Sequence, residues 1–112
     1  MWGTGKVRRE FTFVHDVAAY LSKIIFSLDK IPQTMNLGSG IDYSVQEYYE
    51  VVCQALEYSG EIISDTTRPE GMHSKLMDSS IANQNGWNPA TDIKTGIKLT
   101  IEDFMLNNKG RL

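Results

Sequence analysis

The chain has 112 residues, of which 41% are hydrophobic, with 14 acidic and 11 basic side chains and a formal charge of −3. This length predicts one domain with one core, and the weak acidity excludes a protein held to nucleic acid mainly by a basic face. The single cysteine, Cys53, excludes an internal disulfide framework and a multi-cysteine zinc site. Such cysteine usage is typical of a reducing compartment, so we expect a cytoplasmic protein with neither a signal peptide nor a membrane partner.

The first third of the chain alternates between strand and helix patterns. Aromatic and β-branched residues predict a short strand over 9–14. Asp16 stands at an N-cap position, and apolar residues at helical spacing predict a helix over 17–28. A short strand over 34–37 then leads into the glycine turn Gly38-Ser39-Gly40.

The second helix is predicted by a capping box, because Ser44 is followed three residues later by Glu47. An apolar stripe that includes Cys53 continues until Gly60 supplies the C-terminal stop, so we interpret Cys53 as a core residue and not a reactive thiol. The pattern next predicts a strand over 61–64, a turn-rich loop over 65–71 and an extended piece over 74–77. A short helix over 79–85 should end at Gly86, with Trp87 anchoring the next loop. A last helix should begin at Asp92, and its predicted buried face comprises Ile93, Ile97, Ile101, Phe104 and Met105.

Four helices and three or four short strands predict an α/β domain, mixed α+β in isolation. We expect this domain to cover residues 1–107 and the polar tail 108–112 to be frayed.

The sequence carries none of the common catalytic constellations. The pairs Gly3-x-Gly5 and Gly38-x-Gly40 are followed three positions later by Arg8 and Tyr43, so neither completes the dinucleotide fingerprint G-x-G-x-x-G. None of the five tyrosines has a lysine four residues later, and His15 and His73 have no metal-ligand spacing. We therefore expect no catalytic, cofactor-binding or metal-ligating residue in this chain.

Two segments could instead bind an anion. Trp2 begins a glycine-loosened loop that delivers the cations Lys6, Arg8 and Arg9 to the mouth of a strand, and an arginine fork is well matched to a diphosphate. Lys75 starts an extended piece after the loop around Pro69. Solvated surface charge is the alternative interpretation of both segments, and the residues alone leave it open.

Four motifs, taken in order, resemble one known family. They are Trp-Gly-Thr-Gly-Lys-Val-Arg-Arg-Glu-Phe at 2–11, Met-Asn-Leu-Gly-Ser-Gly at 35–40, Arg-Pro-Glu-Gly-Met-His-Ser-Lys-Leu-Met-Asp at 68–78 and Gly-Trp-Asn-Pro at 86–89. They are similar to the C-terminal part of the extended short-chain dehydrogenases/reductases that act on nucleotide sugars. Arg-Arg-Glu-Phe and Pro-Glu-Gly followed by Lys-Leu-Met-Asp resemble the GDP-L-fucose synthase subgroup, whose members are GDP-4-keto-6-deoxymannose 3,5-epimerase-4-reductases.

The resemblance implies a division of labour between two domains. An N-terminal Rossmann domain would hold NADP(H) and the catalytic residues, and the C-terminal domain would bind the GDP-sugar. This chain matches only the C-terminal domain, so we expect it to be inactive alone and to bind no cofactor. Trp2 and Arg9 match substrate-contacting positions, Lys75 matches a lysine near the nucleotide diphosphate, and Arg8 is their neighbour.

Some residues depart from the family pattern. Glu61 stands where some relatives place a basic substrate contact, and Met72-His73-Ser74-Lys75 has one cation fewer than the usual Thr-Pro-Arg-Lys. Another NAD(P)-dependent nucleotide-sugar epimerase, dehydratase or reductase is therefore an alternative, and a stand-alone, non-enzymatic sugar-nucleotide-binding or interaction module is a second.

The absence of a Rossmann half would also leave apolar surface uncovered. The strand over 34–37 and the first two helices pack against that half in the family. We therefore expect the chain to form a homo-oligomer through the exposed strand edge and helix faces.

Overall fold

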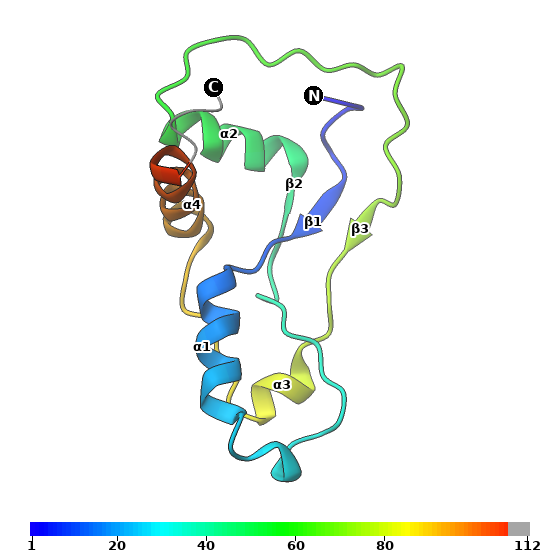
Figure 1. The fold of residues 1–112 in the computed structure, drawn as a ribbon. Coiled ribbons are helices and arrows are strands. Elements are labelled where there is room, and N and C mark those ends of the chain that lie inside the picture. Colours follow the sequence, from blue (N-terminus) through cyan, green and yellow to red (C-terminus); the bar gives the residue numbers. More distant parts are fainter. Residues whose placement is uncertain (108–112) are drawn as a thin grey trace.

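The computed structural model describes residues 1–107 as four α-helices, one short 3₁₀ helix and a three-stranded sheet (Figure 1). In chain order the elements are β1 (Arg8–Glu10), α1 (Val14–Ile24), η1 (Leu28–Lys30), β2 (Asp42–Ser44), α2 (Val45–Ala55), β3 (Ser74–Lys75), α3 (Ser80–Gln84) and α4 (Ile93–Asn107). The mixed α/β fold class is thereby confirmed. The tail predicted to be frayed, 108–112, lies outside the described residues.

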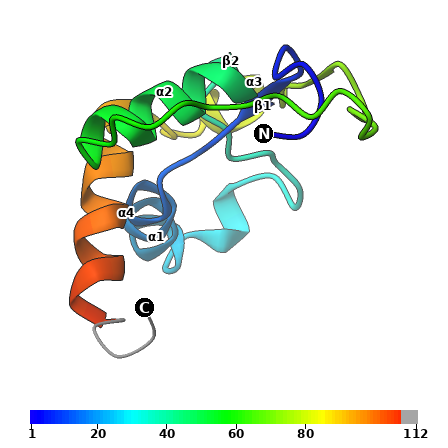
Figure 2. The ribbon, with the colours of Figure 1, turned by 90° about the horizontal axis from the view of Figure 1, so that it is seen from above.

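The sheet has the strand order β2-β1-β3, with β1 antiparallel to β2 and parallel to β3. Helices α2 and α4 pack against each other at the sheet end of the molecule, where α4 runs across α2 (Figure 2). Helices α1 and α3 lie at the other end, and a long segment without helix or strand arches from α2 to β3 (Figure 1). Within residues 1–107, no helix is both long and apolar enough to span a membrane.

The main hydrophobic cluster joins α1 to α3 and comprises Tyr20, Ile24, Ala82 and Trp87. Trp87 is only 3% exposed, and its indole Nε1 donates a 2.7 Å hydrogen bond to the carbonyl of Gly38. The Tyr20 hydroxyl donates to the carbonyl of Asn85 at 3.1 Å. Trp87 therefore anchors its loop to the core, as the sequence predicts.

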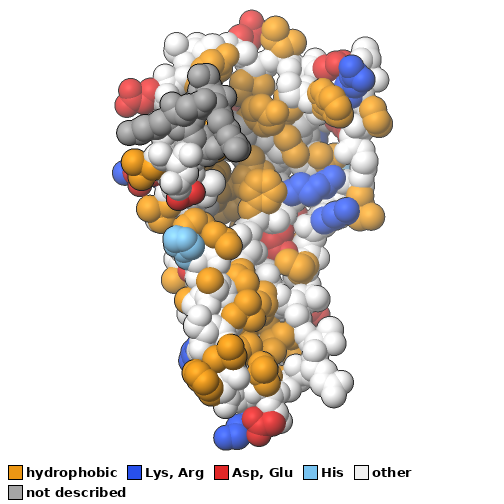
Figure 3. Space-filling model, viewed as in Figure 1, with side chains coloured by type: hydrophobic (Ala, Val, Ile, Leu, Met, Phe, Trp, Pro, Cys, Tyr) orange, Lys and Arg blue, Asp and Glu red, His pale blue; other side chains and the backbone are white. Residues whose placement is uncertain are grey.

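A large apolar surface stays outside this core. The radius of gyration is 16.9 Å, whereas a compact chain of this length has about 13 Å. On and after α1, Leu21, Ile25 and Leu28 are exposed, and Phe26 is 95% exposed. Apolar side chains cover much of the surface in the space-filling view (Figure 3).

The predicted start of the first helix is wrong by three residues. Helix α1 begins at Val14 and ends at Ile24, and Leu28 belongs to η1. Asp16 is not the N-cap, because Phe13 holds that position and Asp16 lies in the first turn of α1. The Asp16 carboxylate accepts hydrogen bonds from the backbone N–H and the hydroxyl of Thr91, at 3.1 and 3.0 Å. The acid fastens the start of α1 to the segment before α4, a contact between residues 75 positions apart.

Two predicted strands, 34–37 and 61–64, are not strands, and the first predicted strand shrinks to β1. Segment 34–37 is irregular, and no strand within residues 1–107 pairs with it. Segment 61–64 runs into an isolated parallel bridge between Trp2 and Asp65. Strand β2 was not predicted from the sequence, because it has only three residues and is defined by its pairing with β1.

Other elements agree with the sequence. The capping box at Ser44 and Glu47 is present, and α3 is followed by Gly86 at φ 87°. Helix α2 ends before Gly60, because Glu57 adopts the left-handed conformation at φ 53° and the Tyr58 N–H donates to the carbonyl of Cys53.

Six expected core positions are less buried than predicted. Cys53 is half-buried. On α4, Phe104 and Met105 are exposed, whereas the other three predicted positions are half-buried.

Candidate functional site

The two faces of the sheet carry different chemistry. Arg8 lies opposite Ser44 and Ser74 in the ladders, and Arg9 lies opposite Tyr43 and Lys75. Since neighbouring residues of a strand point to opposite faces, the side chains of Arg8 and Arg9 lie in different surroundings.

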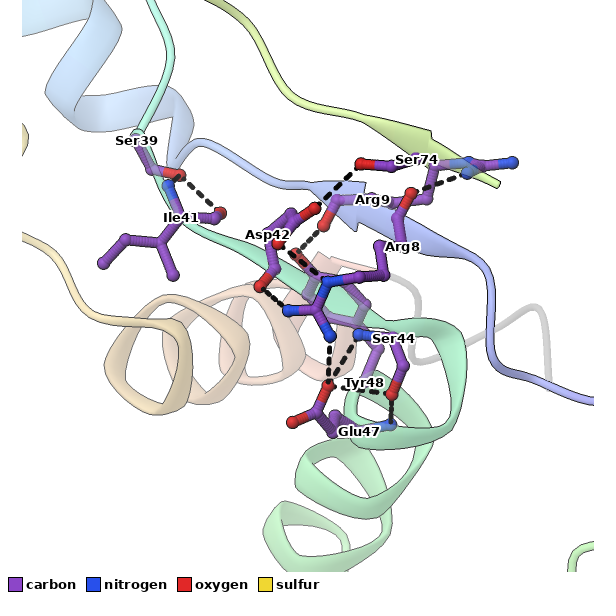
Figure 4. Close-up of polar contacts among 9 residues, drawn as sticks. All are labelled: Arg8, Arg9, Ser39, Ile41, Asp42, Ser44, Glu47, Tyr48 and Ser74. Atoms are coloured by element: carbon purple, nitrogen blue, oxygen red, sulfur yellow. Dashed lines mark hydrogen bonds and ion pairs between the residues drawn. The ribbon is translucent and has the colours of Figure 1, made fainter. Parts of the chain in front are cut away.

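The Arg8 guanidinium binds acids of its own chain. Its Nε lies 2.9 Å from Asp42 Oδ1, its Nη2 donates to the Asp42 carbonyl at 2.6 Å, and its Nη1 lies 3.7 Å from Glu47 Oε2 (Figure 4). Asp42 also accepts a hydrogen bond from the Ser74 hydroxyl at 3.0 Å. Arg8 therefore ties the three strands to the start of α2.

These contacts shift the ionisation of the groups involved. The hydrogen bond with Asp42 raises the pKa of Arg8, and the same bond lowers the pKa of Asp42. The pKa of Glu47 is lowered chiefly by hydrogen bonds from the backbone and hydroxyl of Ser44. Both acids are charged at neutral pH and lie beside the positive charge of Arg8.

Arg9 differs because, within residues 1–107, its guanidinium donates only to carbonyl groups. Its Nη1 donates to the carbonyl of Arg8 at 2.6 Å and to that of Met72 at 2.8 Å. Tyr48 is a buried residue of α2, and its hydroxyl donates to the Arg9 carbonyl at 3.0 Å. This hydrogen bond fastens β1 to α2. Arg9 is thus held in place without a neutralising carboxylate among residues 1–107.

Lys75 lies next to Arg9 in the parallel ladder and is exposed. It too makes no ion pair within the part of the chain that the structure describes. Two basic side chains adjoin on the side of the molecule where β1 and β3 lie (Figure 3). The fold therefore brings together two cations that are 66 residues apart in the sequence.

Trp2 lies before β1, at the same edge of the molecule as the loop over 65–71. Its ring is 69% exposed, and the guanidinium carbon of Arg68 lies 5.1 Å from the ring centroid. Arg68 was not among the residues chosen from the sequence. The signal for it was indirect, since the loop that contains it carried a proline-stiffened turn but no spacing that relates it to Trp2.

The described residues do not fit the NADP(H) implied by the family resemblance. A dinucleotide phosphate needs free backbone N–H groups in a glycine turn. Here the Gly40 N–H donates to Glu10 Oε1 at 2.7 Å, and the Gly38 N–H donates to the Ser79 hydroxyl at 2.9 Å. Side chains of the chain itself therefore take up the N–H groups of this glycine turn. No cluster of three or more metal-ligating acids, histidines or cysteines occurs among residues 1–107.

Two apolar clefts lie elsewhere. One, of about 640 Å³, is lined by the segment after β1 and by α4, and includes Phe11, Phe13 and Ile97. The other, of about 460 Å³, lies beside α1 and includes Leu21 and Met35. Neither of these two clefts is lined by Trp2, Arg9 or Lys75. Trp2 and Lys75 are exposed, and Arg9 is half-buried.

The comparisons with known proteins agree on one group. No family model matches the chain. It is 38% identical over 109 residues to a GDP-L-colitose synthase of Yersinia pseudotuberculosis and 40% identical over 109 residues to a GDP-L-fucose synthase of Azorhizobium caulinodans. Each alignment covers 97% of this chain and 35% of the relative, so the chain spans about a third of the length of these relatives.

A solved structure shows the same relationship in three dimensions. The GDP-mannoheptose C4 reductase of Campylobacter jejuni with NADP bound superposes with a TM-score of 0.71 at 38% identity. The superposition covers 91% of this chain and 33% of the reductase. By sequence and by fold, the chain therefore corresponds to the C-terminal portion of short-chain dehydrogenases/reductases of the GDP-L-fucose synthase type.

Proposed function

We propose that the chain is the GDP-sugar-binding part of an NADP-dependent 3,5-epimerase/4-reductase like GDP-L-fucose synthase, with residues 1–107 as the substrate-binding domain. The observation that carries the proposal is the pairing of Arg9 with Lys75. Like charges directly opposite each other destabilise a sheet, and neither residue has an acid partner among residues 1–107. A diphosphate bound to both cations would remove this repulsion.

Each candidate residue has a distinct role in this proposal. Arg9 and Lys75 neutralise the diphosphate, and the exposed ring of Trp2 contacts a ring of the ligand. Arg8 supports the site indirectly, since its guanidinium is engaged by Asp42 and Glu47.

We assign NADP(H), the hydride transfer and the proton transfers to another domain of the intact protein. The NADP-bound reductase supports this assignment, as does the misfit of the described glycine turn to a phosphate. The chain alone should therefore bind a GDP-sugar without converting it.

A related GDP-sugar reductase with another substrate is the second candidate. Its support is the 38% identity to a reductase of a GDP-heptose, which is similar to the identities with the fucose and colitose synthases. Both candidates share the GDP-diphosphate contacts and differ only in the sugar.

The partner of the apolar surface is, we propose, a Rossmann-type domain in the intact protein and a second copy when the chain is alone. The accessible surface is 8410 Å², about 2,000 Å² more than the value expected for a compact chain of this mass. A standard interface buries only about 800 Å² on each partner, so the excess accessible surface is large enough to form one such interface. Light scattering at high concentration should give a dimer or a larger assembly, and a strictly monomeric mass would contradict self-association.

Calorimetric titration with GDP tests the binding function. We expect saturable binding that Arg9→Ala and Lys75→Ala weaken, and that Lys98→Ala, on the exposed face of α4, leaves unchanged. Incubation with NADPH and GDP-4-keto-6-deoxymannose should give no turnover. Absent GDP binding would refute the proposed site, and turnover that is abolished by mutating this chain would refute the division of labour.

A further inference from the structure

The indole of Trp2 has two faces in different surroundings. One face is covered by the Arg68 guanidinium, whose central carbon lies 5.1 Å from the ring centroid. The side chain is nevertheless 69% exposed, which leaves a large aromatic surface open to solvent.

Asp65 holds both members of this pair. Its carbonyl accepts a 2.8 Å hydrogen bond from the Gly3 N–H, in the backbone bridge that fixes Trp2. Its carboxylate oxygen Oδ2 lies 3.4 Å from Arg68 Nε. The other oxygen, Oδ1, accepts hydrogen bonds from the N–H and hydroxyl of Thr67, at 3.1 and 2.5 Å. One acid therefore sets the position of the aromatic ring and of the cation that covers it.

The same loop reaches the proposed diphosphate site. It begins at the bridge between Asp65 and Trp2, and the carbonyl of Met72 near its other end accepts the hydrogen bond from Arg9. The next residue, His73, accepts a 2.7 Å hydrogen bond from the Arg8 N–H through its carbonyl. Movement of the loop would change the Trp2 surface and the Arg9 surface together.

We propose that Arg68 is a positioning residue, which holds the Trp2 indole so that its free face stacks on the purine base of the nucleoside diphosphate. This rests on the proposed function, in which Arg9 and Lys75 bind the phosphates. A cation on one face draws the ring's electron density toward itself. The opposite face is then better suited to an electron-rich aromatic base than to the partly positive C–H groups of a pyranose.

Tryptophan fluorescence can follow this stack directly. The chain has two tryptophans, and Trp87 is 3% exposed, so a soluble ligand should quench only Trp2. GDP should quench the wild-type chain, and Trp2→Phe should lose the quenching. Inorganic pyrophosphate, which has no base, should bind with little quenching.

Arg68 variants then separate positioning from charge. Arg68→Ala should weaken GDP binding about fivefold, the equivalent of an exposed cation–π contact, and leave pyrophosphate binding unchanged. In the Trp2→Phe background, Arg68→Ala should have a smaller effect, because the ring that it positions has been replaced. Arg68→Lys keeps the charge without the planar fork and should restore part of the GDP affinity.

Three results would overturn the proposal, and they differ in what they leave standing. If Arg68→Ala binds GDP like the wild type while Arg9→Ala does not, the diphosphate site stands and the positioning role fails. If Arg68→Ala weakens GDP and pyrophosphate equally, Arg68 binds phosphate. If the wild-type chain does not bind GDP, the proposed function fails, and this inference fails with it.

Discussion

Replacing Lys75 with glutamine should make the free chain more stable and its complex with GDP weaker. Lys75 and Arg9 are opposite each other in the parallel ladder, and neither has an ion-pair partner within residues 1–107. Two like unit charges on neighbouring strands repel by less than about 1 kcal/mol in water, and salt reduces this further. Lys75→Gln should therefore raise the free energy of unfolding by about 0.5 kcal/mol at low salt.

The same substitution removes a charge-assisted hydrogen bond to the diphosphate. Such bonds contribute about 1.5–3 kcal/mol, so the GDP affinity should fall about 10- to 100-fold. Thermal melts at low and high salt, with and without GDP, measure both effects. The melting temperature of the free chain should rise by about 2–4 °C at low salt and converge with that of the wild type in 1 M NaCl.

Lys98→Gln is the matched control, since it removes the same charge from an exposed position on α4. Lys98→Gln should leave the GDP affinity unchanged. It should also lack the rise in melting temperature at low salt that is expected of Lys75→Gln. A Lys75→Gln chain that is less stable than the wild type, or that binds GDP equally well, would refute the reasoning.

Three further predictions concern stability. Glu57→Gly should stabilise the chain by about 0.5–1 kcal/mol in a urea melt, because glycine tolerates the left-handed φ of 53° that ends α2; a destabilised variant would contradict this. Gly38→Ala should destabilise by about 1–3 kcal/mol, because a Cβ would lie 2.5 Å from Glu10 Oε1; an unchanged urea midpoint would be the contrary result. The lowered pKa of Asp42 gives stability that is present above its unfolded pKa and lost as pH falls through the folded pKa. Acid titrations should therefore show that Asp42→Asn loses less stability than the wild type below about pH 4, and equal losses would exclude this contribution.

The sequence predicted the elements that depend on local signals. The capping box at Ser44 and Glu47 needs only four consecutive residues, and the structure contains it. Helix α3 likewise ends at Gln84, two residues before Gly86, which turns the chain. These features are set by hydrogen bonds between near neighbours in the chain.

The elements predicted wrongly depend on distant partners. Segment 34–37 has the composition of a strand, but no strand among residues 1–107 pairs with it. Asp16 has the residue type of an N-cap, but α1 begins at Val14, and Thr91 binds the Asp16 carboxylate. The pattern around these residues shows neither that segment 34–37 lacks a pairing strand among residues 1–107 nor that Asp16 binds Thr91.

The candidate site divides in the same way. Arg8 and Arg9 are adjacent and identical in type, so residue pattern alone could not distinguish the arginine that binds Asp42 from the one left without an acid among residues 1–107. Only the family resemblance placed Arg9, and not Arg8, at a substrate-contacting position. That distinction follows from the side-chain alternation along β1 and from the pairing of β1 with β2 and β3. The contact of Arg68 with Trp2 likewise requires the loop to fold back onto the start of the chain.

The most direct test of the central claim is an NMR titration of the isotope-labelled chain with GDP. Backbone amide shifts should concentrate on Arg8–Glu10 and Ser74–Lys75, and the indole N–H of Trp2 should move while that of Trp87 stays in place. Shifts confined to the apolar cleft lined by Phe11, Phe13 and Ile97, or no shifts at millimolar GDP, would contradict the account.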